Sequence, residues 1–162
     1  MNKSIKLLAS SRKVGESYSC MVAPFMLDGT HPLCGVNDVF NGIFLRGNVL
    51  GDAMFYGSGA GKLPTASAVV ADVVDMVKHQ NTNIYINWSK EKLELIDYKD
   101  SMNAFFVRTA SDKATVESVF GKVAYVDAVV DGEIAFTTES MSEAEFEEKS
   151  AKINLINRIR LG

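Results

Sequence analysis

Three glycines alternate along the segment Gly57-Ser58-Gly59-Ala60-Gly61, between a strand-like run and the start of a helix. Glycine has no Cβ, so the backbone can turn sharply here and a ligand can approach closely. The spacing is not that of the dinucleotide fingerprint G-x-G-x-x-G, and Lys62 is followed by leucine where a P-loop needs serine or threonine. From the residues alone, the segment is either a ligand-contacting loop or a tight strand-to-helix turn.

The segments on both sides of this loop predict a hairpin and an amphipathic helix. Residues 39–56 carry apolar side chains on both arms of a hairpin, and Gly47-Asn48 is expected to supply the positive φ of its turn. Pro64 suits the first position of the helix. We expect this helix to cover the hairpin, through apolar residues at helical spacing: Ala66, Val69, Val70, Val73 and Val77.

The rest of the chain predicts an α+β fold. Residues 4–9 and 17–26 are strand-like, and residues 81–100 are interpreted as a connector carrying short strands. The last part has the order of a ferredoxin-like βαββαβ unit, with both helices on one face of a sheet. Its expected elements are strand 101–109, helix 111–120 capped by Ser111, strands 123–130 and 133–138 around Asp131-Gly132, a helix opened by the capping box Ser142–Glu145, and strand 152–161.

Charge and composition exclude several classes of protein. The 162 residues contain 17 Lys and Arg against 20 Asp and Glu, a net charge of −3, so no basic field exists for nucleic acid or an anionic membrane. No apolar run approaches the roughly 20 residues of a membrane span, and we expect a cytoplasmic protein. No metal site is expected. Structural roles are expected for Cys20, Cys34 and His31, and a helix-end role for His79.

A series of ordered motifs resembles the second half of homoserine dehydrogenase, the NAD(P)-dependent enzyme that interconverts aspartate semialdehyde and homoserine. The resemblance runs from Ile5 to Lys78, nearly half of the chain. The motifs that carry it are residues 5–9 (IKLLA), 31–33 (HPL), 39–44 (VFNGIF), 51–61 (GDAMFYGSGAG) and 64–72 (PTASAVVAD).

The resemblance implies that the glycine loop closes against the nicotinamide side of the cofactor and the substrate. The cofactor-binding candidates are Gly57, Gly59, Ala60, Gly61 and Thr65. In the family, the catalytic lysine and aspartate and the Rossmann fingerprint precede the segment that corresponds to Met1, so no catalytic residue is assigned here. We therefore expect the chain alone to be inactive and to bind NAD(P) weakly.

The resemblance also implies three parts. Residues 1–80 are the C-terminal part of the catalytic region with a helix returning to the nucleotide domain, 81–100 are a connector, and 101–162 resemble a regulatory ACT domain. An amino-acid effector, threonine first, is a possible ligand, but residues 109–114 lack the Pro and Gly of the usual effector turn.

Dimerisation through the substrate-domain sheet and the ACT-like unit is therefore the preferred role. An open apolar surface is expected along the helix at Ala66, Val69, Val70 and Val73. The alternative is a freestanding ACT-type amino-acid sensor or dimerisation module without catalysis.

Overall fold

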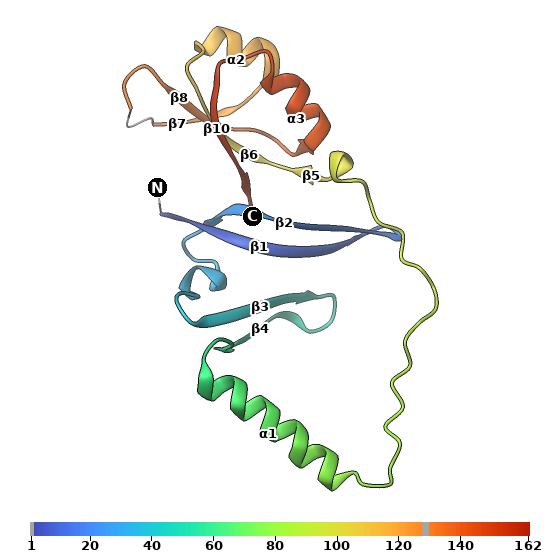
Figure 1. Cartoon of the computed structure of the whole chain (residues 1–162). Coiled ribbons are helices and arrows are strands. Elements are labelled where there is room, and N and C mark those ends of the chain that lie inside the picture. The colour runs from blue at the N-terminus through green and yellow to red at the C-terminus, as the bar shows by residue number, and fades with distance from the viewer. Residues whose placement is uncertain (1, 128–129) are drawn as a thin grey trace. The chain divides into compact units, whose positions relative to one another are not determined.

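The computed structural model describes residues 2–127 and 130–162, and the chain divides into two compact units (Figure 1). One unit, here called unit 1, combines Met1–Gly29 with Leu93–Gly162. The other, unit 2, is Thr30–Lys92. These units cut across the boundaries expected at residues 80 and 100, because the first hairpin of the chain joins the same sheet as its last strand.

Unit 1 contains a six-stranded sheet with the order β1-β2-β10-β6-β8-β7. The first two strands pair antiparallel along their whole length, around Gly15, whose φ of +61° suits the tight turn. Strand β10 runs parallel to β2, and the remaining neighbours are antiparallel. The strands are β1 (Lys3–Val14), β2 (Ser17–Asp28), β6 (Phe105–Thr109), β7 (Ala124–Val126), β8 (Ile134–Thr137) and β10 (Leu155–Leu161).

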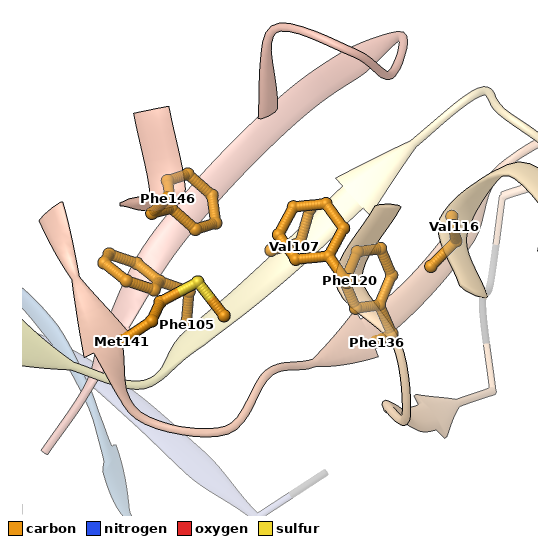
Figure 2. Close-up of a cluster of buried hydrophobic side chains, with 7 residues drawn as sticks. All are labelled: Phe105, Val107, Val116, Phe120, Phe136, Met141 and Phe146. Carbon is orange, nitrogen blue, oxygen red and sulfur yellow. The ribbon is translucent and has the colours of Figure 1, made fainter. Parts of the chain in front are cut away.

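Two helices, α2 (Lys113–Phe120) and α3 (Glu143–Ser150), cover one face of this sheet. Alternate residues of β6 are fully buried, as the period of two of a strand requires when one face is covered. Both helices contribute to a single cluster, so both lie on the same face (Figure 2). Its members are Phe105, Val107, Val116, Phe120, Phe136, Met141 and Phe146.

The elements of the last part follow the expected order, with differences at their ends. Helix α2 begins at Lys113 and is capped by Asp112, whose carboxylate accepts the Thr115 N–H at 2.8 Å. Ser111, the expected cap, instead accepts the Asn154 N–H at 2.8 Å. Ser142 caps α3 as expected. The expected strand 123–130 ends at Val126, and its residues 128–129 lie outside the described residues.

Short elements connect the sheet to the rest of unit 1. Strand β5 (Met102–Asn103) pairs with β9 (Met141–Ser142), just before α3. The 3-10 helix η2 (Tyr98–Asp100) precedes β5. Within the expected connector, Leu95 forms a bridge to Tyr18 of β2, so one short pairing is present there.

Unit 2 contains the expected hairpin, with strands β3 (Phe40–Gly47) and β4 (Gly51–Ser58). The 3-10 helix η1 (Pro32–Gly35) precedes it. The positive φ of the hairpin turn is +76° at Gly51, so the expectation of a positive φ at Gly47-Asn48 is wrong. The pairing of Gly47 with Gly51 leaves three residues between them, and the left-handed Gly51 is the first residue of β4, directly after this loop.

Helix α1 (Lys62–Lys78) does not cover this hairpin, so that expectation is wrong for this chain. No residue of α1 is buried, and Val69 is 58% exposed. Ile43 of the hairpin is likewise 61% exposed. The stripe of valines is present, but the described residues offer no surface that packs on it. The open apolar face expected on this helix is therefore confirmed. Among the described residues, no helix has the length and apolarity to cross a bilayer.

Phe105→Ala should destabilise the protein by about 3–5 kcal/mol, because the ring is fully buried and stacks on Phe146 with centroids 4.0 Å apart. Urea unfolding followed by circular dichroism measures this loss. Phe106→Ala is the matched control on the same strand, since Phe106 is only half-buried. Equal losses for the two variants would contradict the placement of the core.

Candidate functional site

The five candidate residues lie in one exposed stretch where β4 ends and α1 begins. Gly57 is still within β4 and pairs with Asn41 of β3. The strand ends at Ser58, and Gly61 is the N-cap residue of α1. The loop therefore presents backbone groups to solvent directly beside a helix start.

The fold of the loop requires one of its three glycines, and at a second a neighbouring side chain lies where a Cβ would be. Gly61 has φ 117° and ψ 160°, a conformation that is essentially restricted to glycine. At Gly59, an added Cβ would overlap the side-chain amide of Asn41. Gly57 differs, because a Cβ there would meet nothing within 4 Å. The chain's own packing does not explain Gly57, and open space beside it suits the close approach of a ligand.

Thr65 lies in the first turn of α1, where its N–H donates to the carbonyl oxygen of Gly61 at 3.2 Å. The helix begins at Lys62, two residues before the expected start at Pro64. Proline is tolerated anywhere in the first turn of a helix, because the N–H groups there have no helical partner. The structure thus brings Gly61 and Thr65 together at the helix start. Residues 57–61 carry no acid or base, so this loop can position a ligand but cannot transfer a proton.

The motifs next to the loop pack against one another. A Cβ on Gly42 would approach Val36 and Leu33 to 2.8 and 3.0 Å, so the absence of a side chain lets the segment before the hairpin lie on β3. His31 caps η1 by accepting the Leu33 N–H at 3.2 Å, and its ring lies 5.0 Å from that of Phe44. The structural role expected for His31 is confirmed.

The other residues given structural roles are placed as follows. His79 ends α1 and lies 3.2 Å from Asp75, which confirms its helix-end role. Cys20 is exposed on β2, 3.4 Å from the Ser11 hydroxyl, and Cys34 is half-buried, so neither thiol is a core residue. Within residues 2–127 and 130–162, no three His, Cys, Asp or Glu side chains gather to hold a metal ion.

A buried charge cluster in unit 1 escaped the sequence analysis. Glu143, the first residue of α3, is 0% exposed. Its carboxylate accepts hydrogen bonds at 2.8 Å from both Arg158 and Arg160 of β10. Tyr98 and Asn103 each donate to it at 3.0 Å. In the sequence, a carboxylate directly after a Ser N-cap is typical of an exposed side chain that interacts with the helix dipole. No local pattern indicates that Glu143 is buried.

The balance of forces on Glu143 favours its charged form. Burial alone would raise the pKa of its carboxyl, but the hydrogen bonds from Arg160, Arg158 and Tyr98 and the charge of Arg160 outweigh it, so the pKa lies below its usual value. The two arginines reach it because a register shift between Leu155 and Asn157 places Arg158 opposite Val107, on the helix-covered face.

Comparison with known proteins finds that the first part of the chain is similar to homoserine dehydrogenases. The family model "Homoserine dehydrogenase" matches residues 1–74. The homoserine dehydrogenase of Lactococcus lactis is 42% identical over 76 residues, which are 47% of this chain and 18% of that protein. That of Synechocystis is 47% identical over 77 residues, 45% of this chain and 18% of that protein.

The structural likeness extends further along the chain. A homoserine dehydrogenase from Thiobacillus denitrificans matches 99% of this chain with a TM-score of 0.80 at 22% identity, and the match covers 43% of that protein. The chain therefore has the fold of a homoserine dehydrogenase portion, and its residues 1–74 are similar in sequence to that family. It spans about a fifth of the length of the curated relatives by sequence and less than half of the structural neighbour.

Gly61→Ala should disturb the first turn of α1, because an alanine in this backbone conformation costs about 1–3 kcal/mol. The helical ¹³Cα secondary shifts of residues 62–66 should fall. Gly57→Ala is the control, since it meets open space at an ordinary φ and should leave those shifts unchanged. Unchanged shifts in both variants would show that Gly61 does not hold this conformation.

Glu143→Gln should lower the free energy of unfolding at pH 7 by about 3 kcal/mol, because it leaves two arginines around a neutral group. The folded pKa lies below the unfolded value of about 4.3, so the charge stabilises above that pH and is lost as pH falls through the folded pKa. The difference between variant and wild type should thus shrink in acid.

Urea unfolding at pH 7 and at about pH 3 measures both effects. Glu148→Gln is the control, because Glu148 is exposed and pairs with the exposed Lys152 near the end of its helix. A constant difference between the Glu143 variant and wild type over this pH range would contradict the role of the charge.

Proposed function

We propose that this chain forms the C-terminal portion of an NAD(P)-dependent homoserine dehydrogenase that interconverts L-homoserine and L-aspartate 4-semialdehyde in the cytoplasm. This reaction serves threonine and methionine biosynthesis. The observation that carries the proposal is the family match over residues 1–74, which includes the hairpin, the glycine loop and most of α1. It therefore includes every candidate cofactor-binding residue.

In this proposal, the loop positions the cofactor and the substrate. When bound, NAD(P) supplies or accepts the hydride at nicotinamide C4. Open space at Gly57 and the exposed backbone at Gly59, Ala60 and Gly61 fit close contact with a planar ring. The hydroxyl of Thr65 adds one hydrogen-bonding group at the helix start. Holding reactants in a near-attack geometry contributes several kcal/mol to catalysis.

The proposal also requires groups beyond those of the loop. Residues 57–61 offer no proton donor, and the exposed face of α1 is suited to packing on a nucleotide-binding domain. The 162 residues tested alone should therefore neither turn over substrate nor bind NAD(P) tightly. Self-association of the chain, through the sheet of the first part and the last part, is the proposed oligomeric arrangement.

Residues 101–162 are proposed to be an ACT-like unit with a ferredoxin-like fold. The antiparallel order β10-β6-β8-β7, with α2 and α3 on one face, supports this assignment. The junction between β6 and α2 is occupied by the chain itself. Thr109 donates to the Asn154 carbonyl at 2.9 Å, and Ser111 accepts the Asn154 N–H. These bonds favour assembly over binding of threonine or another effector at this junction.

A chimaeric enzyme tests the function. The 76 matching residues of the Lactococcus lactis enzyme are replaced by the corresponding residues of this chain, and NADPH oxidation with aspartate semialdehyde is measured. The chimaera should be active. Adding Gly61→Ala should lower kcat/KM about tenfold or more, because the loop no longer holds the reactants in line.

Gly35→Ala in the chimaera is the control, since its Cβ would meet nothing within 4 Å and it lies outside the loop. It should leave kcat/KM unchanged. A folded but inactive chimaera would overturn the assignment of the first part. Full activity of the Gly61 variant would remove the loop from catalysis. Turnover by the 162 residues alone would contradict the proposed need for a nucleotide-binding domain.

A further inference from the structure

The side chain of Asn41 reaches the glycine loop from the neighbouring strand. Asn41 of β3 pairs with Gly57 of β4, so these two residues face the same side of the hairpin. The Asn41 amide extends along that side to Gly59, where an added Cβ would lie 2.8 Å from the Asn41 Cγ and would overlap the amide nitrogen. The amide therefore lies next to the open space at Gly57.

The polar atoms of this amide are available to a ligand. Asn41 is exposed, and within residues 2–127 and 130–162 its side chain forms no hydrogen bond with another group of the protein. A primary amide offers one oxygen that accepts and one NH2 group that donates. A ligand that covers the amide has to offer partners of both kinds, because a polar group that is left unpaired away from water is costly.

The end of the hairpin that carries Asn41 is held from its other face. Phe40 and Tyr56 directly precede Asn41 and Gly57, and their rings stack with centroids 4.9 Å apart and planes 15° from parallel. Successive residues of a strand point to opposite faces, so this stack lies on the face away from the Asn41 side chain. The stack stabilises the two strands where the loop begins, which suits a site that is formed before the ligand arrives.

The surroundings of the amide favour a neutral partner with an apolar body. Residues 57–61 carry no charged side chain, whereas phosphates and carboxylates are bound best by arginine or lysine. The next pair on the same face is Ile43 and Phe55, which are 61% and 64% exposed. An amide beside bare backbone and apolar side chains matches a planar ring that carries an amide of its own.

We propose that Asn41 binds the carboxamide of the nicotinamide ring, an inference that rests on the proposed function. The Asn41 NH2 group donates to the carboxamide oxygen, and its Oδ1 accepts from the carboxamide NH2 group. Two primary amides pair in this way because each offers a donor and an acceptor in one plane. The pairing orients the ring at the glycine loop, where orientation of the reactants is the contribution assigned to this chain.

The dissociation constant of NADPH tests this pairing in the chimaera with the Lactococcus lactis enzyme, by fluorescence titration without substrate. Asn41→Ala should raise the Kd of NADPH about five- to tenfold, because the hydrogen bonds of one amide pair are lost. The reduced analogue that carries 3-acetylpyridine in place of nicotinamide has no NH2 group. Its Kd should exceed that of NADPH in the unchanged chimaera, and Asn41→Ala should raise it by about twofold at most.

Asn48→Ala is the matched control, because Asn48 lies in the turn at the other end of the same hairpin. It should leave the Kd of both nucleotides unchanged. In the full chain of 162 residues, a nuclear Overhauser effect should join the Asn41 NH2 group to the Hα atoms of Gly59. Absence of this effect in the folded chain would contradict the placement of the amide.

The possible results separate this inference from the proposed function. An active chimaera in which Asn41→Ala leaves the Kd of NADPH unchanged would overturn the pairing alone. An equal rise in Kd for NADPH and the analogue would also overturn it, because a role limited to holding the loop affects both nucleotides alike. A folded chimaera that binds no NADPH would overturn the proposed function together with the pairing.

Discussion

Glu143 is buried at the start of α3, and unit 1 depends on the way its charge is neutralised. Moving a carboxylate out of water costs several kcal/mol, which only close opposite charges and well-formed hydrogen bonds offset. Those groups come from β10, from η2 and from β5, which are far apart in the chain. The same contacts therefore fix the end of the connector and the last helix on one sheet.

The central place of β10 explains why unit 1 is discontinuous in sequence. On one side β10 pairs with β6, and on the other its last residues pair with β2, Arg160 with Phe25 and Leu161 with Met26. The N-terminal hairpin thereby extends the sheet that carries the helices. In unit 2, by contrast, a paired hairpin and a helix with a valine stripe remain open to solvent. Their apolar faces are therefore suited to packing against another surface.

Local patterns predicted the elements well and their environment poorly. The strands of the first hairpin, the helix after the glycine loop and the Ser142 cap follow from periodicity and turn chemistry. The cap of α2 was assigned to the wrong neighbour, because Ser111 and Asp112 are both good caps and only the contact with Asn154 separates them. The covering role of α1 was wrong because periodicity reports an apolar face but not the surface that it packs on.

The sequence by itself determined the similarity of the first part to homoserine dehydrogenases and the position of the glycine loop, since both lie in consecutive residues. Gly61 adopts a backbone conformation that favours glycine, and the Asn41 side chain lies where a Cβ of residue 59 would be. A local motif is able to encode both requirements. Only the tertiary structure decided that Glu143 is buried and that Tyr98 and two arginines of β10 face it. These juxtapositions join residues up to 45 positions apart in the sequence. Sheet pairing and register bring such residues together in space, and no local pattern specifies them.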